Sequence, residues 1–215
     1  MPDNEPKEPE LPLFMSATDR ARMLGSFHAQ RRVLISGQLT SKGLALNARE
    51  LVKLDMQSND PITILLESGG GDVYPTHQLE DMIQAVNSPV DVIALGDCCS
   101  MAVDLMQMCR TRMSLPSSRF LVHYIRHVQK WICDDPERLE TDLSYFRERI
   151  REIHERRLSL YTKRTGLPVE KILEMFRHGE IHEAKFSAQQ AIELRLIDKI
   201  VTDFKFFPRK TEDTK

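Results

Sequence analysis

The feature of this sequence that most constrains its fold is a repeated unit in which a short apolar strand runs into a glycine-containing turn and then a helix. Apolar runs at 33–35, 62–66 and 90–95 are each closely followed by glycine and then by a helical pattern of apolar residues. Three such units of about 30 residues predict right-handed crossovers and a mostly parallel sheet. The runs show little alternation of apolar and polar residues, as expected for a sheet covered on both faces. The sequence therefore predicts an α/β fold.

The other elements are predicted from the same patterns. Helices are expected over 44–58, 74–87, about 100–109, 168–177 and 187–194, and further strands over 120–122 and 197–201.

A long charged helix is expected over about 136–163, because Asp135 followed by Pro136 is a typical helix start. Its apolar residues recur at spacings of four and three: Leu139, Leu143, Phe146, Ile150 and Ile153. A helix of about 28 residues extends about 40 Å, which is longer than the rest of the chain can cover. The stripe therefore favours an oligomer contact over packing on the chain's own core.

Composition sets the expected domain boundaries and excludes several classes of protein. The segment 1–12 is rich in proline and charge, which indicates a flexible tail, and the scattered apolar residues of 13–28 fit a docking arm or a short helix. We expect a flexible N-terminal arm over 1–30, one domain over 31–203 and a C-terminal tail over 204–215. Thirty Lys and Arg against 32 Asp and Glu give a net charge of −2, which provides no general attraction for nucleic acid or anionic lipid. No apolar run is long enough to span a membrane, and the first residues lack the pattern of a secretion signal. We expect a cytoplasmic protein with neither a nucleic-acid nor a membrane partner.

Metal and redox chemistry are also not expected. The four cysteines form no CxxC pair, which excludes a zinc ribbon and a dithiol motif. Histidines at 123 and 127, and at 178 and 182, have the i, i+4 spacing of metal ligands, but no third ligand at a suitable spacing completes either pair. We therefore expect no metal and no cofactor.

Three segments could carry chemistry, and each also has a structural explanation. The glycine run 69–71 could present backbone amides to a ligand or simply form a turn. Ser100 could cap the helix that follows it or act as a nucleophile beside that helix's amides. His123 could be structural or could serve as a general base, with Glu180 or Glu183 downstream to orient it. The order glycine turn, serine, histidine and acid favours catalysis.

The motifs around these residues resemble the proteolytic subunit of the ATP-dependent Clp protease, a family of serine peptidases with a crotonase-like fold. The similarity covers roughly residues 31–203. The matching segments are Glu67–Val73, Gly96–Ala102, Leu115–His123 and Glu183–Asp198. The resemblance implies a crotonase-like fold of strand–helix units in which the long helix protrudes as a handle.

The resemblance also implies roles for individual residues. These are Ser100 as nucleophile, His123 as base, Glu183 as acid with Glu180 as its alternative, Gly71 and Met101 as oxyanion donors, and Gly70 and Val73 as substrate-binding residues. The implied activity is that of a serine endopeptidase acting on unfolded proteins or peptides. The implied partners are further copies of the chain in a ring or double ring, and an AAA+ unfoldase.

The sequence departs from the family pattern in ways that leave alternatives open. Glu183 stands where the family has aspartate, and the His-to-acid distance is longer than usual. Bulky and charged residues at 124–131 replace a Gly/Gln-rich strand that pairs with substrate. One alternative is a proteolytically weak or inactive subunit that acts through assembly. Another is an acyl-CoA enzyme on the same fold, which does not explain the match at 96–101. Cys99 could also compete with Ser100 as nucleophile.

Overall fold

The computed structural model describes residues 17–126, 135–182 and 185–206, and these form two compact units. Unit 1 comprises the described residues up to Phe120 and from Phe186 onward, and unit 2 comprises those between Leu121 and Lys185.

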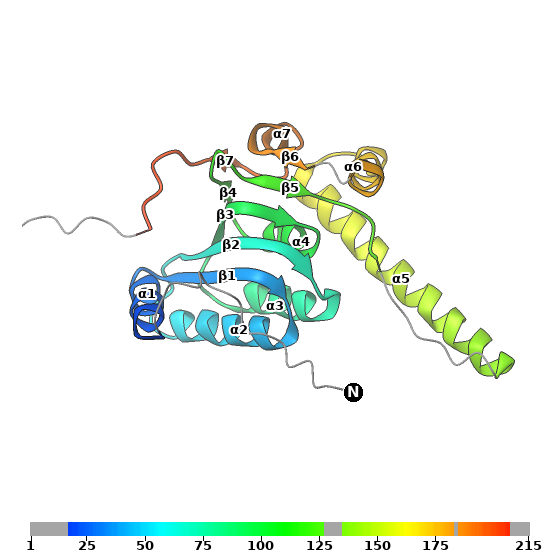
Figure 1. Ribbon diagram of the computed structural model, residues 1–215, viewed down its shortest axis with the longest axis horizontal. Coiled ribbons are helices and arrows are strands. Elements are labelled where there is room, and N and C mark those ends of the chain that lie inside the picture. Colours follow the sequence, from blue (N-terminus) through cyan, green and yellow to red (C-terminus); the bar gives the residue numbers. More distant parts are fainter. Residues whose placement is uncertain (1–16, 127–134, 183–184, 207–215) are drawn as a thin grey trace, which may run out of the picture. The chain divides into compact units, whose positions relative to one another are not determined.

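Unit 1 is built on a parallel sheet whose strand order is β1-β2-β3-β4-β7 (Figure 1). Its strands are β1 (Arg32–Leu39), β2 (Ile62–Gly71), β3 (Val90–Cys99), β4 (Arg112–Ser114) and β7 (Lys199–Ile200). The predicted α/β class and the predicted parallel sheet are confirmed. The short strand β4 was not predicted, because its polar residues give no apolar run.

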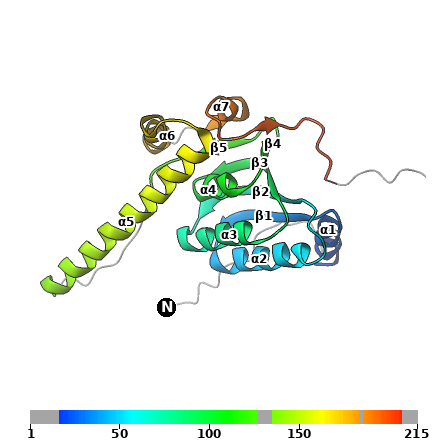
Figure 2. The same cartoon turned by 180° about the vertical axis from the view of Figure 1, so that it is seen from behind.

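Three helices connect the first strands and lie on the same face of β1 to β3 (Figures 1 and 2). They are α2 (Ser41–Asp55), α3 (Val73–Ala85) and α4 (Met101–Met108). Successive strand residues point to opposite faces of a sheet, so Ile64 and Leu66 point one way and Leu65 the other. All three are fully buried, and this explains why the strand pattern showed no alternation.

The domain start expected at residue 31 is corrected by the structure, because most of the segment 13–28, expected as a docking arm or a short helix, lies in a folded helix. Helix α1 (Ala17–Ala29) precedes β1, and its Phe27 is only 3% exposed. Phe27 packs in a core cluster with Leu65 and Ile93. The folded part of the chain therefore begins before residue 31, since α1 covers apolar surface of the sheet.

The C-terminal boundary also extends beyond the expected domain end at residue 203. Phe206 packs against Phe27, with ring centroids 6.2 Å apart. The Arg32 guanidinium lies 5.0 Å from the centre of the Phe204 ring and donates hydrogen bonds to the carbonyl oxygens of Lys205 and Phe206. Residues 204–206 thus belong to the folded body. The rest of the expected C-terminal tail, 207–215, lies outside the described residues.

A short antiparallel pair joins β5 (Arg119–Leu121) to β6 (Phe186–Ser187), with Phe120 opposite Phe186. Ser187 then starts α7 (Ala188–Glu193) with a capping box, in which its hydroxyl accepts from the Gln190 N–H and the Gln190 side chain accepts from the Ser187 N–H. This capping explains why a serine stands at position 187. The two-residue strand β6 was too short to predict.

The described part of unit 2 contains two helices, α5 (Pro136–Thr165) and α6 (Val169–His182). The helix expected over about 136–163 is α5. Its start is capped by Asp135, whose carboxylate accepts from the Arg138 N–H, and it ends at Gly166 in the left-handed conformation.

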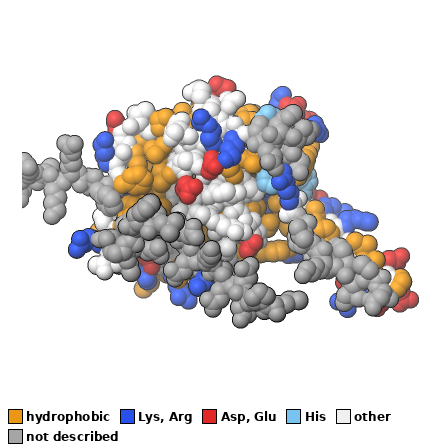
Figure 3. All heavy atoms as spheres, viewed as in Figure 1, with side chains coloured by type: hydrophobic (Ala, Val, Ile, Leu, Met, Phe, Trp, Pro, Cys, Tyr) orange, Lys and Arg blue, Asp and Glu red, His pale blue; other side chains and the backbone are white. Residues whose placement is uncertain are grey.

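Apolar side chains lie among charged ones along the surface of α5 (Figure 3). The solvent exposure of the apolar stripe differs between the two halves of the helix. Leu143 is 42% exposed, whereas Ile153 is buried. Tyr161, closer to the end of α5, packs edge-on against Phe176 of α6, with centroids 5.4 Å apart. The second half of the helix thus contributes to the core of unit 2, while Leu143 in the first half exposes an apolar side chain.

Candidate active site

Ser100 occupies the turn between β3 and α4 in an unusual backbone conformation. Its φ of 54° and ψ of −128° differ from the extended conformation of an ordinary N-cap residue. It stands at the N-cap position of α4, yet its side chain makes no capping hydrogen bond. Strained backbone of this kind costs about 1–3 kcal/mol and is concentrated at functional sites. These observations argue against the capping interpretation and leave the half-buried hydroxyl available for chemistry.

The end of β2 lies directly against this turn. Gly70 has a φ of 101°, and a Cβ on it would lie 2.7 Å from the Cβ of Ser100 and 2.9 Å from the carbonyl oxygen of Cys99. No side chain fits there, so glycine is required both by the close approach and by its conformation. The N–H of Gly70 donates to the hydroxyl of Ser68, which in turn donates to the carbonyl oxygen of Gly37. The N–H of Gly70 is thus already used in a hydrogen bond. Gly70 contributes to the site because its lack of a side chain allows the turn with Ser100 to come close.

The two residues expected to supply oxyanion donors lie next to the turn. Met101 is the first residue of α4, so its N–H has no acceptor within the helix. Gly71 pairs with Leu39 of β1, and a Cβ on Gly71 would overlap the Leu39 carbonyl oxygen. Val73, expected to bind substrate, is the first residue of α3. These residues gather at the carboxyl ends of β2 and β3, where parallel sheets commonly bind ligands.

An irregularity in the sheet produces this geometry. The pairing of β2 with β3 shifts register between Leu66 and Ser68, where Ala94 and Cys98 are the corresponding partners. The extra residues in β3 include Gly96, whose φ is 65°. Bulges of this kind turn the end of a strand and redirect a side chain. Here the bulge comes immediately before the turn that carries Ser100.

The neighbouring cysteines are poor competitors for the nucleophile. Cys98 is fully buried and Cys99 is 4% exposed. Burial raises the pKa of the Cys98 thiol well above its ordinary value, and the nearby Cys99 and Cys109 raise it further. A thiol with a raised pKa stays protonated at neutral pH, so Cys98 is a weak nucleophile. Against Cys99 stands its burial.

His123, the expected base, follows β5 and belongs to unit 2, whereas Ser100 belongs to unit 1. The carbonyl oxygen of His123 accepts a hydrogen bond of 3.0 Å from the guanidinium of Arg157 on α5. Of the two expected acids, Glu180 is a residue of α6, and Glu183 lies outside the described residues. The segment 124–131, which stands where the family pattern has a substrate-pairing strand, is described only as far as Arg126, and residues 124–126 belong to no helix or strand.

Sequence reasoning missed three residues that shape this region. The hydroxyl of Ser68 accepts a hydrogen bond from the N–H of Gly70, and the guanidinium of Arg157 donates one to the carbonyl oxygen of His123. Gly179 on α6 approaches Val122 so closely that a Cβ on it would overlap the Val122 carbonyl oxygen. Gly179 could have been noticed, since a glycine inside a helical pattern often has a packing reason. The sequence carried no comparable signal for Ser68 and Arg157.

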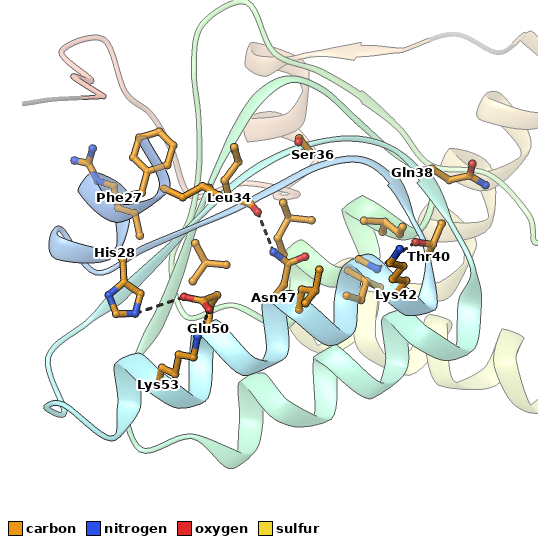
Figure 4. Close-up of a pocket in the computed structure, with 18 of the residues that line it drawn as sticks. Phe27, His28, Leu34, Ser36, Gln38, Thr40, Lys42, Asn47, Glu50 and Lys53 are labelled. Atoms are coloured by element: carbon orange, nitrogen blue, oxygen red, sulfur yellow. Dashed lines mark hydrogen bonds and ion pairs between the residues drawn. The ribbon is translucent and has the colours of Figure 1, made fainter. Parts of the chain in front are cut away.

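A cavity of about 880 Å³ lies elsewhere in unit 1, between α1, β1 and α2 (Figure 4). At its rim, Glu50 pairs with His28 and Lys53, and the side-chain amide of Asn47 donates to the carbonyl oxygen of Leu34 on β1. Ser100 and the glycine run are not among its lining residues. This cavity is therefore separate from the candidate active site.

Within the residues that the structure describes, no three His, Cys, Asp or Glu side chains cluster as metal ligands would. The described helices also include none that combines the length and the apolar character needed to cross a bilayer.

Comparison with known proteins agrees with the fold. A family model described as Clp protease matches residues 16–204. The chain is 25% identical over 193 residues to the ATP-dependent Clp protease proteolytic subunit of Paracoccus denitrificans, covering 86% of this chain and 89% of the relative. It is 27% identical over 202 residues to proteolytic subunit 3 of the same protease in Rhizobium meliloti, covering 93% and 95%.

A solved structure of similar fold is a mutant of ClpP1 from Listeria monocytogenes. Its TM-score is 0.70 at 23% sequence identity, covering 84% of this chain and 96% of that chain. The resemblance predicted from the sequence motifs and the crotonase-like fold class are thus both confirmed.

Proposed function

Because this chain belongs to the Clp protease family, we propose that it is a serine endopeptidase that cleaves peptide bonds inside an oligomeric chamber. The curated relatives are named as proteolytic subunits of an ATP-dependent protease, which supports peptidase chemistry. The observation that carries the proposal is Ser100. Its positive φ, uncapped hydroxyl and contact with Gly70 are what a nucleophile on a sharp strand-to-helix turn requires.

The proposed mechanism follows from the chemistry of these residues. Ser100 Oγ attacks the peptide carbonyl while His123 accepts the serine proton and later donates it to the leaving amine. Glu183 orients the imidazole, with Glu180 as the alternative acid. The N–H groups of Gly71 and Met101 stabilise the oxyanion of the tetrahedral intermediate. Loss of one such donor costs about 3 kcal/mol of barrier in other serine peptidases.

The proposed substrates are unfolded proteins or peptides, bound at Gly70 near the end of β2 and at Val73, the first residue of α3. The proposed assembly is a homo-oligomeric ring or double ring in the cytoplasm, with an AAA+ unfoldase as partner. Exposure of Leu143 on α5 supports a contact between copies of the chain, because an apolar side chain gains free energy when it is covered.

A second candidate function is a weakly proteolytic or inactive subunit that acts through assembly. It is favoured by the glutamate at 183 and by the bulky residues that begin with Tyr124, where the family pattern has a strand that pairs with substrate. Substrate pairing by strand addition requires accessible backbone, and residues 124–126 form no strand in this structure.

One experiment separates the two functions. The full chain is treated with a fluorophosphonate probe and the labelled residue is identified by mass spectrometry, with Ser100→Ala and Cys99→Ser as variants. A peptidase gives labelling at Ser100 in the wild type and in Cys99→Ser, and gives neither labelling nor peptide hydrolysis in Ser100→Ala. Absence of labelling in the assembled wild-type protein would support the inactive subunit.

The acid is assigned by a second pair of variants. Glu183→Gln should reduce kcat by orders of magnitude because an unoriented imidazole is a poor base. Activity that survives Glu183→Gln and is lost in Glu180→Gln would transfer the role to Glu180.

A further inference from the structure

Arg157 is a buried cation on α5 whose role the proposed mechanism does not include. The residue is 2% exposed, and its guanidinium lies 4.5 Å from the centre of the Phe176 ring and 5.9 Å from that of Tyr161. Burying a charged group is costly unless hydrogen bonds satisfy it. One of its donors, Nη1, bonds the carbonyl oxygen of His123 at 3.0 Å. The position of this arginine is thus tied directly to the backbone of the proposed base.

The peptide after His123 needs such a partner because regular structure does not hold it. Strand β5 ends at Leu121, and the residues from Val122 to Arg126 belong to no helix or strand. This carbonyl therefore lies outside the regular secondary structure, and the bond from Arg157 contributes directly to its direction. A hydrogen bond from a charged donor is stronger than one between neutral groups, and the planar guanidinium also fixes its direction.

Gly179 on α6 lies close against Val122, the residue before His123. Glycine inside a helix destabilises it by about 1 kcal/mol relative to alanine, so its presence calls for a reason. A Cβ at Gly179 would overlap the carbonyl oxygen of Val122 and lie 2.9 Å from its carbonyl carbon. Only glycine lets the helix backbone approach the strand end this closely.

Tyr124, on the other side of His123, is held by side-chain packing. Its ring meets Phe176 of α6 edge-on at 5.8 Å and lies 6.1 Å from His154 of α5. Three consecutive residues, 122 to 124, are thus each contacted by α5 or α6.

We propose that Arg157 and Gly179 are positioning residues that fix the backbone of His123, and so aim its imidazole at the reacting serine. This inference rests on the proposed function, in which His123 is the general base. Neither residue touches the substrate. Both act by holding the peptides on either side of the histidine, and misplacing a catalytic group by about 1 Å can cost about 100-fold in rate.

The test compares matched variants of the full chain. Arg157→Met keeps an unbranched apolar stem and removes the charged donor, whereas Arg157→Lys retains a charged donor group. Gly179→Ala introduces the clashing Cβ, and Gly25→Ala in α1 is its control, because a Cβ there would meet nothing within 4 Å. For each variant, kcat and KM on a fluorogenic peptide, the rate of fluorophosphonate labelling at Ser100 and the melting temperature are measured.

We expect Arg157→Met and Gly179→Ala to reduce kcat and the labelling rate by about 10- to 100-fold, with KM changed by less than about twofold. Arg157→Lys should recover part of the loss, and Gly25→Ala should behave as the wild type. If Arg157→Met does not fold, the kcat values of Arg157→Lys and Gly179→Ala test the positioning role.

Wild-type protein that labels at Ser100, together with variants that melt earlier but keep their kcat, would overturn the positioning role while leaving the proposed function intact. Equal effects on kcat from Gly179→Ala and Gly25→Ala would overturn it too. Wild-type protein that neither labels nor hydrolyses peptide would instead overturn the proposed function on which the inference rests.

Discussion

Gly70 and Ser100 are in direct backbone contact, so close that a Cβ on Gly70 would lie 2.7 Å from the Cβ of Ser100. Two strand ends meet at this point, that of β2 at Gly70 and that of β3 just before Ser100. The contact restricts the turn that carries the serine, because any residue larger than glycine at position 70 must displace it. The geometry of the proposed nucleophile therefore depends on a residue that is 30 positions earlier in the chain.

Gly70→Ala should abolish most activity. The added Cβ collides with the Ser100 turn, and alanine is strained at a φ of 101°. We expect kcat to fall by about 100-fold or more, with a loss of about 1–3 kcal/mol in the free energy of unfolding. Peptide hydrolysis and denaturant unfolding measure the two effects.

The neighbouring glycine provides the control for this variant. A Cβ at Gly69 would meet nothing within 4 Å, so Gly69→Ala should keep the wild-type kcat and change the free energy of unfolding by about 0.5 kcal/mol or less. A Gly70→Ala protein as active as Gly69→Ala would contradict the contact described here.

Alkylation of cysteine should leave the activity intact at pH 7.5. Burial raises the pKa of the Cys98 thiol, so the reactive thiolate forms only at pH values above those at which a free cysteine ionises. Iodoacetamide treatment of the folded protein, followed by peptide hydrolysis and mass mapping, tests this. The Cys133→Ser background removes a cysteine outside the described residues. Inactivation that coincides with alkylation at 98 or 99 would assign the nucleophile to a cysteine.

Asp91→Asn should destabilise unit 1 in a pH-dependent way. Burial of Asp91 by itself would raise the pKa of its carboxyl, but hydrogen bonds from Arg110 and Thr111 outweigh this, and the pKa lies below its ordinary value. A lowered folded-state pKa contributes stability above the unfolded pKa of about 4, and this stability is lost as pH falls through the folded pKa. At pH 7 the variant should lose about 1–2 kcal/mol, a reduced value because Arg110 is half-exposed.

Urea unfolding between pH 2 and pH 7 checks this prediction. The difference between the wild type and Asp91→Asn should be constant above about pH 5 and should shrink toward pH 2. The exposed Asp203→Asn serves as the charge control. A difference that grows as pH falls would contradict the lowered pKa.

Phe146→Asp combined with Ile150→Asp should break an assembly made through α5. Both residues lie on the apolar stripe, which can be covered by the same helix of a second copy. Covering several such side chains, at roughly 1.5–3 kcal/mol each before entropy costs, is enough for a stable interface. Sedimentation at micromolar concentration should show the wild type as a large oligomer and the double variant as a smaller species.

A second pair of substitutions controls for charge. Ser144→Asp with Ser159→Asp adds the same negative charge at exposed positions off the stripe and should leave the assembly unchanged. A wild-type protein that sediments as a 24.9 kDa monomer would refute the assembly and weaken the proposed chamber.

Much of the fold could be predicted from local sequence patterns. The strands β1, β2 and β3 and the helices after them were predicted because their apolar runs and helical spacings are long enough to be distinctive. The start of α5 was predicted because Asp135 and Pro136 are a strong local signal. Strands β4 and β6 were missed, since two- or three-residue strands have no period. For the segment that forms α1 the sequence left a docking arm or a short helix open, because the folding of α1 depends on Phe27 packing against distant residues.

The sequence by itself determined the α/β class, the parallel sheet, the family and which residues are candidates for the site. Each of these follows from contiguous motifs or from short-range periodicity. The proposed roles of Ser100, His123 and Glu183 stay predictions that the experiments above test. Only the tertiary structure decided that the hydroxyl of Ser100 makes no capping bond, that Gly70 restricts its turn, and that Arg157 bonds the carbonyl of His123. These relationships join residues up to 34 positions apart, and they arise from packing between elements that no local pattern encodes.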